Sequence, residues 1–406
     1  MAPRKTSVKA KTAAASKKIR VSYGGWYQRT TLHLSEIYDF FSFGTSHLPL
    51  LKSELERLWR KLSLAEVSRE SGYLEFISAK TASGITIRYY EDGLYMLESE
   101  VDDISEVPDE KRKLEEYYAG SLSPAISYIF SLGAPTPKVL ANIKTVHPTV
   151  IVGTMTDPSR FNPDEIFGPV YSKLSSPGVS VVKTPLYIFV MTSPAAAVVA
   201  TPVVENLVFF REFKDHLEKY LDIHRTVWEE ISEIKERKDI SGTEVDEIRG
   251  KLDGYQKTIS LISNRINQMG SYVKTRSSIA KSMKVEEYLI GFFQFKFETL
   301  IDTLDYIKEI WKMTSEYLTS SITNLQEIKN QSAARGIQSL QLITSLGVVS
   351  GILGYLSKNE VPKMTFIGTM YFAAIILVAW GANKTISHFY LKKRYNLKFG
   401  RREENI

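Results

Sequence analysis

The chain has 406 residues, and its 52 lysines and arginines exceed its 46 aspartates and glutamates, which gives a formal net charge of +6. It contains no cysteine, so a disulfide framework and a thiolate metal site are both excluded. A chain of this length has room for one sizeable soluble domain, a helical region and a membrane segment.

Positive charge is concentrated at the two ends of the chain. Residues 1–20 carry seven lysines and arginines with no acid before Glu36, and seven more lie in residues 384–406. The first 20 residues predict a disordered basic arm, without the apolar core of a signal peptide. We expect both basic segments to lie near anionic lipid headgroups, and we expect no nucleic-acid partner.

Residues 21–200 predict a cytosolic α+β domain with a mixed or antiparallel sheet. Leucines at helical spacing predict a helix over 46–70, and the Glu91-Asp92-Gly93 turn predicts a hairpin because Asp-Gly tolerates a positive φ. Short helices are expected in 102–118 and 123–144, and a loop in 161–177. The expected strands are 73–79, 85–90, 94–101, 150–155, 179–182, 187–191 and 196–200.

Residues 201–335 predict a stalk of long antiparallel or coiled-coil helices. Thr201 and Pro202 supply a cap and a first-turn proline, and the first arm breaks at 239–242. The second arm carries a stripe of apolar residues at heptad positions, namely Val245, Ile248, Leu252, Tyr255, Ile259, Ile262, Ile266, Met269 and Val273. Such a stripe needs a partner helix, from the same chain or from another subunit.

The third arm carries a similar stripe, which starts at Phe297 and reaches Arg335 with no Gly or Pro. We therefore predict one helix from Val285 to Ser357, about 110 Å long. Thr314 and Ser321 replace bulky residues in the stripe. Its members are Phe297, Leu300, Leu304, Ile307, Trp311, Thr314, Leu318, Ser321, Leu325 and Ile328.

Two uncharged runs follow, 336–357 and 364–383, separated by the loop 358–363. Each is long enough to cross a bilayer, so they predict a C-terminal two-helix transmembrane hairpin. The alternative is a pair of buried core helices in a soluble domain. The basic tail 384–406 places both termini in the cytoplasm and the loop outside, which predicts a multi-pass protein of the cell membrane.

This order of elements resembles the CorA-type divalent-cation channels over roughly residues 202–395, with YLTSSITNLQEIKNQSAARGIQSLQLITSL (317–346) resembling the family's approach to the membrane. The resemblance implies a homo-oligomer in which the long helices of five subunits form a funnel and the first span lines the pore. The family's Gly-Met-Asn signature is absent, because the corresponding stretch reads Gly354-Tyr355-Leu356-Ser357-Lys358-Asn359. Lys358 and Lys363 against Glu360 would give a positively charged entrance that repels divalent ions.

The first span supplies the candidate site residues. Gln338, Gln341 and Ser345 share one face, which Val348 and Ile352 continue, and Asn359 lies at the outer end. They predict the lining of a pore, or alternatively polar contacts between packed helices. Gly347 and Gly351 form a Gly-x-x-x-Gly pattern that lets helices approach closely.

Other chemistry has weaker signals. The acidic run Asp102, Asp103, Glu106, Asp109 and Glu110 would hold a regulatory cation or simply form a solvated helix start, and the six histidines have no ligand spacing. No enzymatic motif is found, and no cofactor is expected beyond a transported or regulatory cation such as magnesium. Two functions remain: a CorA-like membrane transporter, and a membrane-anchored coiled-coil scaffold whose cytosolic domain binds a partner.

Overall fold

The computed structural model of the protein describes residues 18–28, 33–132, 149–236, 239–241, 244–293 and 297–356. Beyond these, it describes only 366, 370, 373–374, 377–378, 380–381, 384–385 and 394–396. The chain divides into two compact units. The first comprises Met1–Leu221 with Leu261–Lys308, and the second comprises Asp222–Ser260 with Glu309–Ile406.

The first unit contains an N-terminal α+β domain. Its strands are β1 (Ile19–Trp26), β2 (Leu64–Ser71), β3 (Glu75–Thr81), β4 (Thr86–Tyr90), β5 (Leu94–Val101), β6 (Thr149–Thr154), β7 (Ser172–Ser176), β8 (Val179–Lys183) and β9 (Tyr187–Thr192). Its shorter α-helices are α1 (Leu34–Phe43), α2 (Lys52–Leu62), α3 (Val107–Tyr117), α4 (Ser123–Ile129) and α8 (Glu286–Phe293). One π-helical turn covers Tyr118–Leu122, and 3-10 turns cover Ile104–Glu106, Phe130–Leu132, Pro158–Arg160, Glu165–Phe167 and Pro194–Val199.

Within the described residues, nine strands form one mixed sheet in the order β2-β3-β4-β5-β1-β6-β9-β8-β7. Only the β6–β9 pair among them is parallel. The predicted hairpin turn between β4 and β5 is confirmed. Gly93 adopts a φ of +86°, and a Cβ there would lie 2.1 Å from the Tyr27 carbonyl oxygen, so glycine is required at this position.

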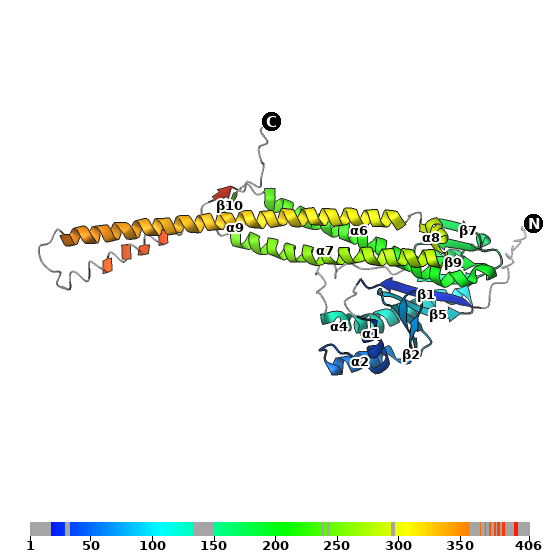
Figure 1. Ribbon diagram of the computed structural model, residues 1–406. Helices are drawn as coiled ribbons and strands as arrows, with labels where there is room; N and C mark the ends of the chain where they lie inside the picture. Colours follow the sequence, from blue (N-terminus) through cyan, green and yellow to red (C-terminus); the bar gives the residue numbers. More distant parts are fainter. Residues whose placement is uncertain are drawn as a thin grey trace, which may run out of the picture. The chain divides into compact units, whose positions relative to one another are not determined.

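The sheet lies between two helical layers, which Figure 1 shows above and below β1 and β5. On one side, alternate residues such as Val21, Tyr23 and Leu97 form a buried core with α1 to α4. On the other side, Trp26 contacts Phe209 and Phe213 of α6 (Ala200–Glu236), with ring centroids 5.0 and 6.0 Å apart. Burial of each such side chain contributes about 1.5–3 kcal/mol to folding.

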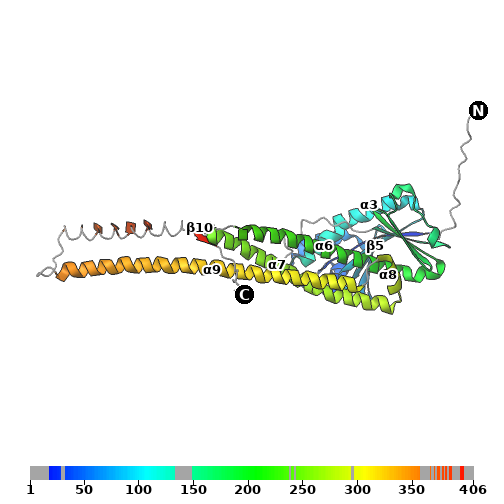
Figure 2. The ribbon, with the colours of Figure 1, turned by 90° about the horizontal axis from the view of Figure 1, so that it is seen from above.

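The second unit is built on long helices: the end of α6, the start of α7 (Glu244–Ser282) and most of α9 (Phe297–Leu356). These run side by side in both views (Figures 1 and 2). α7 and α9 are antiparallel, because Asp246 pairs with Lys329 while Gln256 contacts Thr319. α6 runs parallel to α9, since His224 meets Trp311 and Trp228 meets Tyr317.

The two predicted apolar stripes are confirmed. All heptad positions of α7 from Val245 to Val273 are buried except Tyr255, which is half-buried. The α9 stripe is buried at every position from Leu300 to Leu325, including Thr314 and Ser321. A single chain therefore provides partners for these stripes, as the intramolecular alternative required.

Five sequence predictions are wrong, and one of them is the cap at Thr201, because α6 already begins at Ala200. The helix expected over 46–70 ends at Leu62, where Ser63 adopts a left-handed φ of 51°, and the edge strand β2 follows. Residues 196–200 are not a strand: the Ser193 hydroxyl accepts the backbone N–H of Ala196 and starts a helical turn that leads into α6. β7 lies within the predicted loop 161–177, and the single helix from Val285 to Ser357 is instead α8 and α9.

The predicted transmembrane hairpin is described only in part. α9 continues to Leu356 and so covers nearly all of the first run, whereas the loop 358–363 and the basic arm 1–17 lie outside the described residues. The second run is described only at separate helical positions from Phe366 to Gly381. Among the described residues, one helix is long and apolar enough to cross a membrane, Pro194–Ile234, and half of its apolar window is buried in the protein.

Candidate functional site

The buried stripe of α9 leads directly to the predicted site residues. Its two polar members are satisfied locally: the Thr314 hydroxyl donates to the Ile310 carbonyl at 2.8 Å, and the Ser321 hydroxyl donates to the Tyr317 carbonyl at 2.9 Å. Thr314 Oγ1 also lies 2.8 Å from His224 Nε2 of α6. The polar positions Thr314 and Ser321 of this stripe therefore fit packing within one chain.

Burial along α9 ends at Leu325. Between Glu327 and Gly351, every side chain that the structure describes is exposed or half-buried. The exposed fraction reaches 58% at Ile337 and 56% at Val348. From Gly336 to Leu356 the helix is about 30 Å long and carries no charge, and the side chains that the structure describes on it are exposed or half-buried.

The candidate residues on this segment divide between two faces. At about 100° per residue, Gln338, Gln341 and Ser345 lie on one face and Gly347 lies on the opposite one. Gln338, Gln341 and Ser345 are all exposed. A Cβ at Gly347 or Gly351 would meet nothing within 4 Å. Asn359 lies outside the described residues, so the structure does not bring it to the other candidates.

The predicted acidic run forms a helix start. Asp103 accepts the backbone N–H of Ser105 at 2.9 Å, which lowers the pKa of its carboxyl group. Asp109 pairs with Arg112 at 2.6 Å and Glu110 with Lys113 at 2.9 Å, each one turn along α3. In the described parts of the chain, no group of three or more His, Asp or Glu side chains could hold a metal ion.

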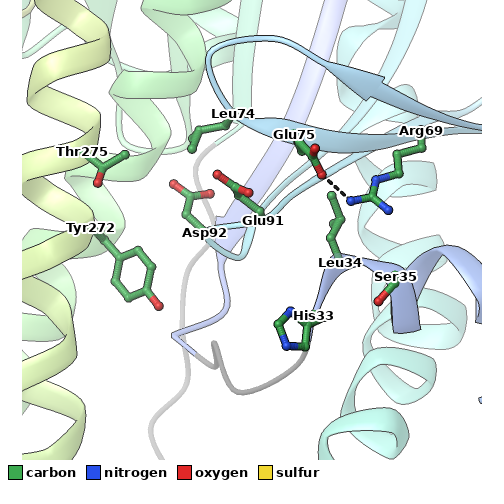
Figure 3. A pocket seen from close by; sticks show the side chains of 10 residues that line it. All are labelled: His33, Leu34, Ser35, Arg69, Leu74, Glu75, Glu91, Asp92, Tyr272 and Thr275. Atoms are coloured by element: carbon green, nitrogen blue, oxygen red, sulfur yellow. Dashed lines mark hydrogen bonds and ion pairs between the residues drawn. The ribbon is translucent and has the colours of Figure 1, made fainter. Parts of the chain in front are cut away.

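A cavity of about 420 Å³ opens in the first unit, between the sheet and α7. Figure 3 shows Glu91 and Asp92 of the β4–β5 turn facing Tyr272 and Thr275 of α7. Arg69 of β2 pairs with Glu75 of β3 at its rim. The remaining lining comes from His33, Leu34, Ser35 and Leu74.

Most of the charged groups around this cavity pair with one another. Burial raises the pKa of Glu91, and the charges of Glu75 and Asp92 raise it further, although Arg276 and Arg69 oppose the shift. Glu75 pairs with Arg69 and Asp92 pairs with Arg276, so the charges of these two carboxylates are offset by their own partners.

A buried ion pair lies beside the cavity. The Arg276 guanidinium donates from Nε to Asp92 Oδ2 at 2.6 Å and from a terminal nitrogen to Oδ1 at 2.9 Å. Both side chains are almost fully buried, and the guanidinium lies over the rings of Tyr90 and Phe209 at 5.2 and 5.3 Å. Burial disfavours the charged form, but Asp92 outweighs it and the pKa of Arg276 is raised.

A second ionic cluster connects the sheet to α6. Arg88 of β4 donates to Glu98 of β5 at 2.5 Å and to Glu205 of α6 at 2.9 Å. The Tyr90 hydroxyl also donates to Glu205 at 2.5 Å. Burial raises the pKa of Glu205, which Arg88 opposes. The cluster fixes α6 on the sheet by charge-assisted hydrogen bonds.

α6 also carries a buried glutamate and a half-buried histidine next to β1. Burial raises the pKa of Glu212 to about 8, and the charge of Asp215 adds to the shift. Burial lowers the pKa of His216 to about 4. The His216 ring lies 5.2 Å from the Trp26 ring, and its Nδ1 lies 2.7 Å from the Glu212 carbonyl oxygen.

Sequence reasoning did not single out Arg276, Glu205 or Glu212. One signal was present: Arg276 lies three residues after Val273, at the next position of the apolar stripe. A lone arginine on such a stripe indicates a buried ion pair. Its partner Asp92 is 184 residues away, so no local pattern could identify it.

The chain was compared with protein-family models, with curated proteins and with solved structures, and none of the three comparisons finds a match.

Proposed function

We propose that the protein is one subunit of an oligomeric membrane channel that resembles the CorA type and conducts cations along the end of α9. The observation that carries the proposal is the uncharged segment Gly336–Leu356 of α9, whose described side chains are not buried by any described part of the chain. A segment about 30 Å long matches the hydrocarbon core of a bilayer.

Exposed apolar side chains on this segment need a non-aqueous environment. Ile337 and Val348 are more than half exposed, and the separately described residues Phe366, Met370, Leu377 and Val378 are more exposed still, at 62 to 81%. Large apolar side chains that are exposed to this extent are typical of a membrane or protein interface when they form a patch. Lipid and neighbouring copies are the two coverings that this proposal supplies.

The two faces of the segment suggest how the copies are arranged. Polar side chains in lipid are costly, so Gln338, Gln341 and Ser345 would face a water-filled path at the centre of the oligomer. The opposite face, with Gly347 and Gly351, would let another span approach closely. The polar residues would thus line the path, and the glycines would pack against a neighbouring helix.

The second candidate function is a membrane-anchored scaffold without transport. It is favoured by the loop, where Lys358 and Lys363 oppose a single Glu360. Repeated around an oligomer, this charge would repel divalent cations from the outer entrance. In the scaffold, the polar face of α9 would form contacts between helices. The cavity of the first unit would be available to a cytosolic ligand.

Reconstitution in liposomes tests the channel. We expect the purified protein to admit magnesium, cobalt or nickel to an internal dye, and Gln341→Leu to reduce that flux without changing the mass of the oligomer. Lys358→Glu should raise it by reversing the charge at the entrance. Ile343→Leu, on the opposite face, is the matched control and should leave flux unchanged. An oligomer that admits no cation above empty vesicles removes the channel and leaves the scaffold.

A further inference from the structure

A second, two-stranded sheet joins the tail of the chain to the turn between α6 and α7. β10 (Asp239–Ser241) and β11 (Arg394–Asn396) are antiparallel, with Asp239 opposite Asn396, Ile240 opposite Tyr395 and Ser241 opposite Arg394. The two strands are more than 150 residues apart in sequence. Both belong to the second unit.

α9 leaves the described bundle close to the same turn. Lys329 of α9 contacts Asp246 of α7 at 2.6 Å, and Gln326 accepts from Arg249 at 2.5 Å. Asp246 lies in the first turn of α7, which begins three residues after β10. The segment 330–393 therefore begins and ends at the α6–α7 turn.

The lengths of the two halves agree with a return path. From Lys329 to Leu356, α9 extends about 40 Å away from this turn. The segment 357–393 has room for a helix of equal length and a connecting loop of about ten residues. Helical conformation is described at Phe366, Met370, Trp380 and Lys384 within it.

We propose that residues 394–396 form a strap, which is an intrachain strand that binds the edge of β10. The strap fixes the end of the segment 330–393 at the α6–α7 turn, where the segment also begins. Pairing by main-chain hydrogen bonds is the way an extended peptide adds to a sheet edge. Ile240 and Tyr395 are residue types that favour strands. α6 ends three residues before β10 begins, and α7 begins three residues after it ends.

The strap would also constrain the two predicted membrane spans, and this consequence rests on the proposed function. If 336–357 and 364–383 are spans, the strap requires the first to begin and the second to end on the side of the membrane that holds the helical unit. It also connects the exit of the second span to the base of the stalk, so that the two spans cannot move independently of α6 and α7. An anchor without a strap would leave the second span free of such coupling.

Cysteine cross-linking tests the strap, and the natural absence of cysteine makes the background clean. Opposed residues of an antiparallel pair have Cα atoms about 4.5–5.5 Å apart, within the range of a disulfide. In full-length protein in native membranes, we expect Ile240→Cys with Tyr395→Cys to form a disulfide within one chain upon mild oxidation. Ser260→Cys with Tyr395→Cys is the control, because Ser260 lies about 24 Å along α7 from its first residue.

Two differently tagged chains, one with Ile240→Cys and the other with Tyr395→Cys, distinguish a strap within a chain from strand exchange. A cross-linked heterodimer, or equal cross-linking of the Ser260 control, overturns the proposal. The reaction does not depend on transport, so a strap that forms in a protein without cation flux would count against the channel alone.

Impermeant thiol labelling in intact cells tests the side on which the strap lies. Asn359→Cys in the loop should be labelled, and Asn396→Cys in β11 should be labelled only after the cells are permeabilised. Labelling of Asn396→Cys but not Asn359→Cys in intact cells contradicts the cytoplasmic strap.

Discussion

At the scale of residues, the first unit contains charges that water does not stabilise. Arg276 and Asp92 satisfy one another through two hydrogen bonds, and the Arg88 cluster satisfies Glu98 and Glu205. Removing one partner of such a buried pair typically costs about 3–5 kcal/mol, because the other charge remains buried. These groups therefore restrict how the sheet and the two helices can pack.

Glu212 is different, because its burial favours the neutral form. Its pKa of about 8 in the folded protein exceeds the ordinary value of 4.5, so the folded state binds the extra proton between these two values. Stability from this group is fully present below pH 4.5 and is lost as the pH rises towards 8. At alkaline pH, the folded protein contains a buried carboxylate.

Glu212→Gln should therefore stabilise the protein only at higher pH. We expect the variant and the natural protein to melt at similar temperatures near pH 4.5, and the variant to gain roughly 2–5 kcal/mol near pH 9. The comparison cancels the opposite effect of His216, whose lowered pKa weakens the folded state in acid. Thermal unfolding of the detergent-solubilised protein from pH 4.5 to 9 measures the difference.

Glu218→Gln supplies the control on the same helix, because Glu218 is exposed and forms only a surface pair with Lys214. It should change the melting temperature little at any pH. A Glu212→Gln effect that is constant across the range would contradict the raised pKa.

At the scale of elements, the long helices are specified by sequence, because three- and four-residue steps of apolar residues place the stripe on one face whatever lies elsewhere in the chain. Ile262 shows this, as it was expected at a heptad position and is fully buried. We expect Ile262→Asp to cost about 4 kcal/mol, since it buries an unpaired charge.

Ser260→Asp, two residues earlier and exposed, tests whether the effect of Ile262→Asp comes from burial. Melting temperatures of the two full-length variants measure the difference. If Ile262→Asp melts no lower than Ser260→Asp, the stripe is not a packed seam.

Strands whose partners are distant in sequence could not be predicted as well. β1 contains Gly24 and Gly25 and gave no clear strand pattern, yet it lies between β5 and β6, which are about 70 and 130 residues further along the chain. A Cβ at Gly24 would lie 2.5 Å from Met96 Sδ, so its neighbour in the sheet explains that glycine. The edge strands β2 and β7 are largely polar, and pairing rather than periodicity decides their conformation.

The candidate site was predictable only where it depends on helical spacing. The face with Gln338, Gln341 and Ser345 follows from helical spacing alone, and α9 is helical through all three positions. The cavity beside Asp92 was not predictable, because it combines side chains from α1, β2, β3, the β4–β5 turn and α7. Neither the strap nor the ionic clusters have a local signature, since both join residues far apart in the chain.

At the scale of the whole molecule, α9 passes from a packed helical region to a segment whose described side chains are exposed or half-buried. The apolar stripe of its first half is buried, whereas its last 21 residues carry no charge and the described side chains among them are exposed or half-buried. The channel requires that, in the membrane, water reaches one face of that last part. The scaffold requires that lipid or protein covers all of it.

Cysteine accessibility along α9 distinguishes these two cases most directly. In oriented membrane vesicles, Gln341→Cys and Ser345→Cys should react with a small, charged thiol reagent, whereas Ile343→Cys, on the opposite face, should not. Reaction at 341 and 345 alone is the result that a water-filled path predicts. Equal reactivity at all three positions, or none at any, contradicts a pore lined by this helix.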